Sequence, residues 1–267
     1  MRVIKAQLEK APFEKVDKHA RLAPESEAQT VESLAKYLAS VAESDVEKAR
    51  AAFVWVATHI AYDIKICQQK VIRGQDAEDT LKRRTGVCDG YSNLFEELCL
   101  GMGLVAEKWR GWSKGYGFVP GTIPKGRGHS WNAVKIEGEW GLVDCTWGAG
   151  YMDGMDFVKE FDNFWFLTTP EDFLPQHYPD NIIGNDPDEN LAAQLVANPL
   201  TVEQWSNLMI TKNAIDAGLA PISHKEVLIE TDQKELVITV SNPKELEMNG
   251  DIELMKNSKK FPICTVV

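Results

Sequence analysis

The chain has 267 residues, of which 44% are apolar and 26% charged, with a formal net charge of −11. This composition is typical of a globular protein with one substantial core, alone or with a smaller second domain. The acidic balance argues against nucleic acid and anionic membrane surfaces as main partners.

The first residues contain no continuous apolar run, and no later run is long enough to cross a bilayer. We therefore expect neither a secretory signal nor a membrane span. An odd number of cysteines without a C-x-x-C pair predicts reduced thiols instead of disulfides or structural zinc. This indicates a cytoplasmic protein. The cysteines are Cys67, Cys88, Cys99, Cys145 and Cys264.

The N-terminal part is predicted to be an arm followed by two helices. Residues 1–27 are polar and poorly periodic, which predicts an extended arm. An apolar stripe predicts a helix over 30–42. Ser44 then has the place of an N-cap, with Glu47 completing a capping box for a helix that runs to residue 60.

Residues 63–78 are polar and irregular, and a short helix is predicted at about 77–84. The next helix begins near Cys88 and buries an apolar stripe. It ends at Gly101 or Gly103.

The apolar period then changes from helical to alternating. Residues 107–112 predict a strand, and residues 129–136 and 139–146 predict a hairpin that turns at Glu137-Gly138. Residues 113–128 between them contain five glycines and two prolines. A loop of this length usually carries function, and we expect it to gate a site near His129.

The C-terminal part is predicted to be built from short elements. Residues 150–200 are aromatic-rich and interrupted by prolines, residues 201–218 predict a helix, and residues 225–267 predict a small module of four strands. The expected organisation is an arm and helix over 1–44, a core over 45–185, and an acidic linker, helix and β-rich module over 186–267.

The segment Gly86-Val87-Cys88-Asp89-Gly90 places a cysteine where a loop turns into an apolar helix. A helix N-terminus favours the thiolate, and the Cys88 N–H would face a bound oxyanion. Gly86 allows a sharp turn, and Gly90 leaves room for a substrate carbonyl. The alternative is a buried cysteine acting as a small apolar residue, which suits Cys99 and Cys145.

The hairpin register predicts that a histidine and an aspartate meet. If Glu137-Gly138 forms a two-residue type I′ turn, Ile136 pairs with Glu139. His129 and Asp144 then share a face as diagonal neighbours about 7–8 Å apart, within side-chain reach.

A buried aspartate is costly unless it is paired, and beside an imidazole it fixes the tautomer and stabilises the imidazolium. The alternative is an exposed polar pair on the free face of a sheet. The other histidines are interpreted as structural or solvated, with His177 and His224 in loops. They are His19, His59, His177 and His224.

Three segments, residues 86–91, 128–132 and 142–148, resemble the catalytic motifs of the transglutaminase-like superfamily, and residues 55–63 resemble its lead-in helix. The resemblance covers about residues 45–240. It implies an α+β, papain-like or transglutaminase-like fold, with a helical N-terminal part packed on an antiparallel sheet and a small C-terminal β module.

Residues 166–173, His177-Tyr178-Pro179 and residues 199–205 resemble the kyphoscoliosis peptidase branch of that superfamily. Residues 182–194 depart from the branch, because an acidic insertion replaces the usual stretch. This puts branch-specific partner binding in doubt.

By resemblance, Cys88 is the nucleophile, His129 the general base and acid, and Asp144 the residue that orients the imidazole. The main-chain N–H of Cys88 is one oxyanion donor. The candidates for a second donor are the side chains of Trp55, Gln68 and Gln69.

The expected enzyme attacks amide carbonyls of protein or peptide substrates and releases the thioester to water, as a peptidase or amidase. Acyl transfer to amines is the alternative. A non-catalytic scaffold with cytoskeletal partners and an amidase that removes asparagine-linked glycans are further possibilities. No cofactor or metal is expected, because the acidic run at 186–190 lacks the glycine and glutamate of a calcium loop.

Overall fold

The computed structural model divides the chain into two compact units, residues 1–207 and residues 208–267, and each unit is described by itself. The three-part organisation expected from the sequence stays a prediction. The structure describes residues 4, 8, 13–69, 73–119, 121–124, 128–180, 187–208, 218–224, 226, 229, 232, 236–243, 252–256 and 259–263.

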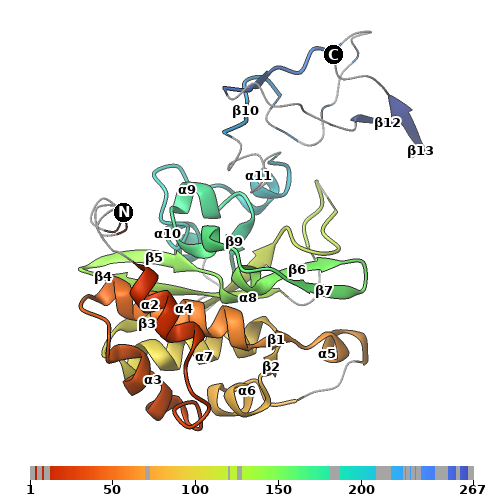
Figure 1. Cartoon of the computed structure of the whole chain (residues 1–267). Coiled ribbons are helices and arrows are strands. Elements are labelled where there is room, and N and C mark those ends of the chain that lie inside the picture. Colours follow the sequence, from red (N-terminus) through yellow and green to blue (C-terminus); the bar gives the residue numbers. More distant parts are fainter. Residues whose placement is uncertain are drawn as a thin grey trace. The chain divides into compact units, whose positions relative to one another are not determined.

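In the first unit, helices lie against one face of an antiparallel sheet (Figure 1). The two longest of these helices, α4 and α7, bury many of their side chains. Helix α7 packs on strands β3 and β4. The helices of this layer are α2 (Phe13–Arg21), α3 (Val31–Ala39), α4 (Asp45–His59), α6 (Ala77–Arg83) and α7 (Cys88–Gly101).

The prediction of an extended arm is wrong for the part that the structure describes, because α2 packs on α4. Its Val16 and Ala20 are buried, and Arg50 of α4 forms a two-pronged ion pair with Asp17 through bonds of 2.7 Å. A nine-residue helix with few apolar residues gives a weak periodic signal, and the partner surface on α4 supplies the stability.

The predicted start of α4 is confirmed at Ser44, which accepts from the Glu47 N–H at 3.3 Å. The reciprocal bond differs from a capping box, because the Glu47 carboxylate accepts from the Glu43 N–H at 2.6 Å. The prediction for 63–78 is wrong at Ile64–Gln69, which forms the short helix α5.

The short helix predicted at about 77–84 is confirmed as α6. Arg84 itself takes the left-handed conformation with φ of 56°, and it caps the helix. Strand β2 (Thr85–Gly86) then pairs in parallel with β1 (Ala61–Tyr62) and delivers the chain to α7. Helix α7 runs from Cys88 to Gly101, as predicted.

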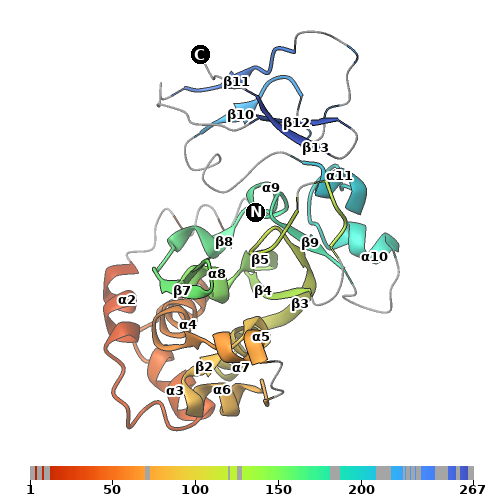
Figure 2. The ribbon, with the colours of Figure 1, turned by 90° about the vertical axis from the view of Figure 1, so that its right-hand side faces the viewer.

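Five antiparallel strands form the central sheet in the order β8-β5-β4-β3-β9 (Figure 2). Pairing between β3 and β4 is regular, with Gly111 opposite His129 and Val105 opposite Lys135. The strands are β3 (Val105–Ser113), β4 (His129–Ile136), β5 (Glu139–Val143), β8 (Phe166–Thr168) and β9 (His177–Pro179).

The predicted hairpin register is confirmed, since Ile136 pairs with Glu139. Glu137 and Gly138 both have positive φ, of 47° and 92°, as a type I′ turn requires. The predicted strand to residue 146 is too long, because β5 stops at Val143 and α8 (Cys145–Ala149) follows.

Short elements follow α8, and two parts of this region cover the other face of the sheet. Helix α9 and the segment after α10 contribute Phe173, Leu174 and Ala193, which line a cavity with sheet residues. These short elements match the prediction for 150–200. They are β6 (Gly150–Asp153), β7 (Asp156–Lys159), η1 (Asn163–Trp165), α9 (Pro170–Phe173) and α10 (Pro187–Ala192), and α11 (Val202–Ser206) follows them.

The second unit has two described strand pairs. Strand β10 (Ala220–Pro221) pairs with β11 (Val240–Ser241), and β12 (Ile252–Lys256) pairs with β13 (Lys259–Ile263), both antiparallel. The predicted helix over 201–218 begins at Thr201 as its N-cap, and residues 209–217 lie outside the described residues. Residues 182–186, 227–228, 244–251 and 264–267, on which other predictions fall, also lie outside them.

Candidate active site

Cys88 is the first residue of α7 and is only partly buried. As the first residue of a helix, its N–H has no partner in a preceding turn. The loop before it is held from the side, because the Val87 N–H donates to Gln75 Oε1 at 2.9 Å. The sequence therefore places a thiol at the positive end of a 14-residue helix.

Gly90 has a different role from the one predicted. It is buried, and a Cβ there would lie 2.7 Å from both Gln75 Oε1 and Thr80 Oγ1. The missing side chain lets α7 approach the region of α6. It makes room for the protein and not for a substrate.

Cys99 and Cys145 are buried, as the alternative reading of a free cysteine expects. Burial raises the pKa of both thiols. The prediction that Cys145 lies in a strand is wrong, since it begins α8. Among the cysteines whose burial is described, Cys88 alone reaches the surface.

His129 begins β4 and joins Cys88 to Asp144. Its Nε2 lies 2.7 Å from Asp144 Oδ2, and Cys88 is within hydrogen-bonding reach of the same ring. Burial lowers the pKa of His129, but the charge and hydrogen bond of Asp144, together with Cys88, outweigh it and raise this pKa to about 10. The surroundings of His129 thus favour its protonated form.

Asp144 is completely buried at the end of β5 and serves as the N-cap of α8. Its Oδ1 accepts from the N–H groups of Thr146 at 2.9 Å and Trp147 at 3.0 Å. Burial would raise its pKa, but the charge of His129 and the hydrogen bonds from two histidines hold it well below the usual range. The carboxylate is thus ionised and fixed in orientation.

His177 is the residue that the sequence analysis misjudged. It lies in β9 instead of a loop, is 1% exposed, and places Nε2 2.9 Å from Asp144 Oδ2. Burial lowers its pKa to about 4, although Asp144 acts in the opposite direction. Its motif carried the family resemblance, but the β3–β9 register that turns it toward Asp144 has no local sequence signal.

A second set of polar contacts joins α7 to the sheet. Asp89 Oδ1 accepts from Ser130 Oγ at 2.9 Å and from Arg110 Nη2 at 3.0 Å. Burial raises the pKa of Asp89, but the Ser130 bond and the nearby cations lower it overall. Because Asp89 follows Cys88 and Ser130 follows His129, this bond links the two backbones that carry the site.

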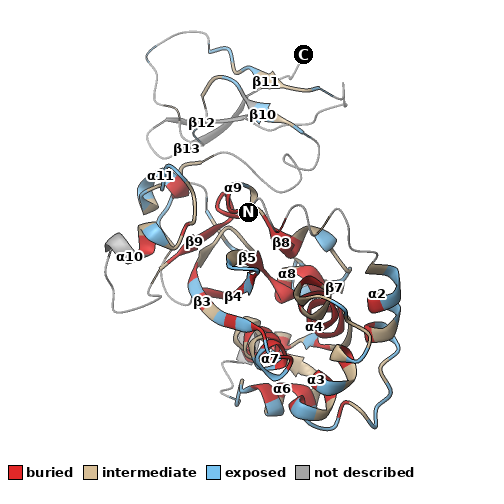
Figure 3. Cartoon of the chain, turned by 90° about the vertical axis from the view of Figure 1, so that its left-hand side faces the viewer, coloured by how far each residue is buried: buried red, intermediate tan, exposed pale blue. Residues whose placement is uncertain are grey.

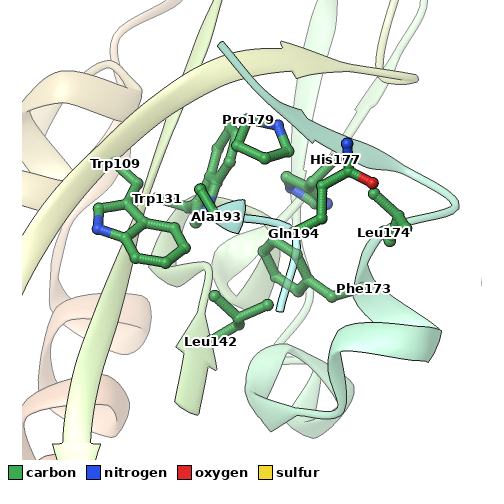
Figure 4. A pocket seen from close by; sticks show the side chains of 9 residues that line it. All are labelled: Trp109, Trp131, Leu142, Phe173, Leu174, His177, Pro179, Ala193 and Gln194. Carbon is green, nitrogen blue, oxygen red and sulfur yellow. The ribbon is translucent and has the colours of Figure 1, made fainter. Parts of the chain in front are cut away.

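Strand β4 is buried along most of its length (Figure 3), and on the face that carries His129 the side chains of Trp131 and Ala133 are at most 1% exposed. This overturns the alternative of an exposed polar pair. Trp131 and Phe173 pack there with ring centroids 6.0 Å apart. A small cavity, roughly the size of one water molecule, separates the sheet from α9 and the segment after α10, with His177 in its wall (Figure 4).

Trp147 forms the outer side of the cluster, with its ring centroid 5.5 Å from that of His129. The glycine-rich loop reaches it, because a Cβ at Gly115 would lie 3.0 Å from the Trp147 ring. The loop is therefore adjacent to the site, and its role as a gate stays a prediction.

The second oxyanion donor stays open. The Trp55 indole stacks on His59 at 4.7 Å and lies under Arg84, and its Nε1 has no hydrogen-bond partner. Gln68 and Gln69 end α5, and their side chains lie outside the described residues.

His129, Asp144 and His177 form the one group of three or more possible metal ligands within the described residues. Two imidazoles and a carboxylate are ligand types of Zn²⁺ and Fe²⁺ sites. Both Nε2 atoms, however, lie at hydrogen-bond distance from one carboxylate oxygen. A proton on each nitrogen accounts for these contacts without an ion.

The model of the transglutaminase-like superfamily matches residues 32–145. Kyphoscoliosis peptidases of Mus musculus and Homo sapiens are 33% identical over 234 residues, which cover 86% of this chain and 34% of each relative. This chain belongs to the transglutaminase-like superfamily. Within that superfamily it groups with the kyphoscoliosis peptidase branch, and the fold is of the papain-like, transglutaminase-like class.

Two further proteins match this chain at lower identity. Hillarin of Drosophila melanogaster is 28% identical over 223 residues, covering 75% of this chain and 25% of that protein. A solved structure of a TGase has a TM-score of 0.34 at 18% identity, over 61% of this chain and 40% of that one. The chain spans about a third of the length of the kyphoscoliosis peptidases. In the described part of the chain, no helix has the length and apolar character to cross a membrane.

Proposed function

We propose that this protein is a thiol enzyme that attacks amide carbonyls of protein or peptide substrates and hydrolyses them as a peptidase or amidase. Cys88 is the nucleophile, His129 the general base and acid, and Asp144 the group that orients and stabilises the imidazolium. The observation that carries the proposal is His129, which joins a buried, ionised carboxylate to the one surface thiol among the described cysteines.

The chemistry follows from these charges. The His129 imidazolium favours a thiolate at Cys88, which adds to the substrate carbonyl while the Cys88 N–H stabilises the oxyanion. Nδ1 of His129 then gives its proton to the leaving amine, and a thioester remains. Water, deprotonated by His129, adds to the thioester and releases the acid and the thiolate.

Hydrolysis is favoured over acyl transfer because the relatives that match most of this chain are named peptidases. A direct test incubates the protein with unfolded casein and a fluorescent primary amine. We expect new peptide N-termini that the Cys88→Ala variant does not produce. Labelling of casein by the amine without new N-termini would instead establish acyl transfer.

A non-catalytic scaffold is distinguished by the reactivity of the thiol. Iodoacetamide at neutral pH is expected to modify Cys88 much faster than Cys99, as located by mass spectrometry, because the thiolate is the reactive form. Equal rates for the two cysteines in the folded protein would argue against any thiol enzyme.

A further inference from the structure

Two imidazoles share one oxygen of the candidate catalytic carboxylate. We propose that His177 is a positioning residue, which donates from Nε2 to Asp144 Oδ2 and thereby limits how tightly Asp144 holds the proton of His129. The inference rests on the proposed function, because it concerns the acid strength of the group that serves the leaving amine.

The donor assignment follows from the carboxylate. An ionised carboxylate can only accept hydrogen bonds, so a nitrogen at 2.7 or 2.9 Å from its oxygen must carry the proton. His129 and His177 both meet Oδ2 through Nε2. Each Nε2 is therefore protonated, and the second nitrogen of His129 is the one left for Cys88.

The carboxylate is saturated by this arrangement. Oδ1 accepts two backbone N–H groups and Oδ2 accepts two imidazoles, which together occupy the four lone-pair sites of the group. Because His177 takes one site on the oxygen that His129 uses, less negative charge is available to hold the His129 proton. The imidazolium is then a stronger acid toward a leaving amine.

A purely structural histidine is a poor explanation of this position. The His177 ring stacks on Phe173 with centroids 4.0 Å apart, and burying a polar ring among aromatics is costly without a strong partner. The titratable groups that act on it are Asp144 and His129. The rings around it are those of Trp131, Trp147, Trp165 and Phe173.

The neutral state of His177 agrees with this role. Its pKa of about 4 leaves it uncharged at neutral pH, so it adds a hydrogen bond without adding a second positive charge beside His129. A cation there would oppose the imidazolium that catalysis needs.

The first test needs no substrate and no variant. Nitrogen-15 spectra of the histidine rings at pH 7 are expected to show His177 as the neutral Nε2–H tautomer and His129 as an imidazolium. A proton on Nδ1 of His177, a charged His177, or an unprotonated Nε2 as metal coordination requires, would each overturn the proposal.

The second test compares two variants by the pH profile of Cys88 alkylation with iodoacetamide, whose basic limb reports loss of the His129 proton. In His177→Phe, which keeps the ring and removes the donor, we expect the midpoint to rise by about one pH unit. In His177→Gln, whose amide N–H takes the place of Nε2–H, it stays near the wild-type value. His59→Phe, another histidine stacked on an aromatic ring, is the matched control and leaves the profile unchanged.

An unchanged midpoint in His177→Phe, or equal shifts in the Phe and Gln variants, would reduce His177 to a core residue. If His177→Phe does not fold, the nitrogen-15 spectra of the wild-type protein and the alkylation profile of His177→Gln still test the proposal. The proposed function fails separately if the wild-type protein shows no casein cleavage that depends on Cys88. Neither histidine measurement uses a substrate, so the two failures can be told apart.

Discussion

Two buried charge clusters in the first unit differ in whether the paired charges also contact a reactive side chain. At the α2–α4 contact, Arg50 is paired by two bonds to Asp17 and by a third to Asn163. At the end of the sheet, Asp144 accepts four hydrogen bonds, and its partner His129 also interacts with Cys88. Burial and pairing of charge are common to both. The proposed chemistry needs one thing more, a group that can exchange a proton between the buried pair and a thiol, and the second cluster has it in His129.

The largest expected effect is that of Cys88→Ala, which should abolish cleavage without a matching loss of stability. Cys88→Ala should lower Cys88-dependent casein cleavage by at least about 10⁴-fold, because the covalent step is lost. Its unfolding free energy should change little, since Cys88 is only partly buried. Urea unfolding can be followed by fluorescence, because all eight tryptophans lie within residues 1–207.

Cys99→Ala is the matched control and should behave in the opposite way. Cys99 is buried in α7, so the variant loses stability while cleavage is retained. Retained cleavage in Cys88→Ala would remove this cysteine from the mechanism.

The next effect concerns the orienting carboxylate. Asp144→Asn keeps the shape and a side chain suited to the N-cap of α8, but it removes the charge that stabilises the imidazolium. In the serine-protease triad the corresponding change lowers kcat by about 10⁴-fold, and we expect a loss of similar order. The measurement is kcat for casein cleavage together with the alkylation rate of Cys88. A variant with wild-type kcat would show that Asp144 is only a cap.

A change in the cluster of Arg50 and Asp17 should lower the stability of the protein and leave the reactivity of Cys88 unchanged. Arg50→Ala leaves Asp17 without its partner, and we expect a loss of about 3 kcal/mol in unfolding free energy. The alkylation rate of Cys88 in the folded variant should stay at the wild-type value. A large change in that rate would mean that the two clusters are coupled, and the contrast between them would fail.

The histidines give the site a pH signature in stability. His129 has a pKa raised to about 10, so its contribution is complete below the ordinary value near 6.5 and is lost as pH rises from 6.5 to about 10. His177 has a pKa lowered to about 4, so the unfolded chain binds its proton first, and stability falls as pH drops from 6.5 to about 4. Each group changes the unfolding free energy by about 1.4 kcal/mol per pH unit in its window.

Stability of the first unit should therefore be greatest near pH 6.5 as far as these two groups decide it. His177→Gln removes the acid slope and keeps the basic one, which urea unfolding at pH 4.5, 6.5 and 8.5 can measure. An acid slope that persists unchanged in this variant would assign it to other groups.

The sequence predicted the local features of the site better than the distant ones. The turn at Glu137-Gly138 set the hairpin register, and the glycines around Cys88 located the start of α7, because both signals lie within a few residues. Helix α2 was missed because its stability comes from α4. His177 was missed because strand β9 joins β3 across more than sixty residues of sequence, and no local pattern specifies that pairing.

The smallest effect tests whether the sheet positions α7 for the proposed reaction. Ser130→Ala removes the 2.9 Å bond to Asp89 and should lower the rate of casein cleavage by about fivefold, the size of one ordinary hydrogen bond. Asp89 keeps its contact with Arg110, so α7 stays attached. Ser206→Ala is the control: Ser206 is equally buried, and its hydroxyl donates to the Glu203 carbonyl in α11. Both variants should lose similar stability, while only Ser130→Ala slows the reaction. Equal rates for the two would show that the Asp89 contact attaches the helix without setting the geometry of the site.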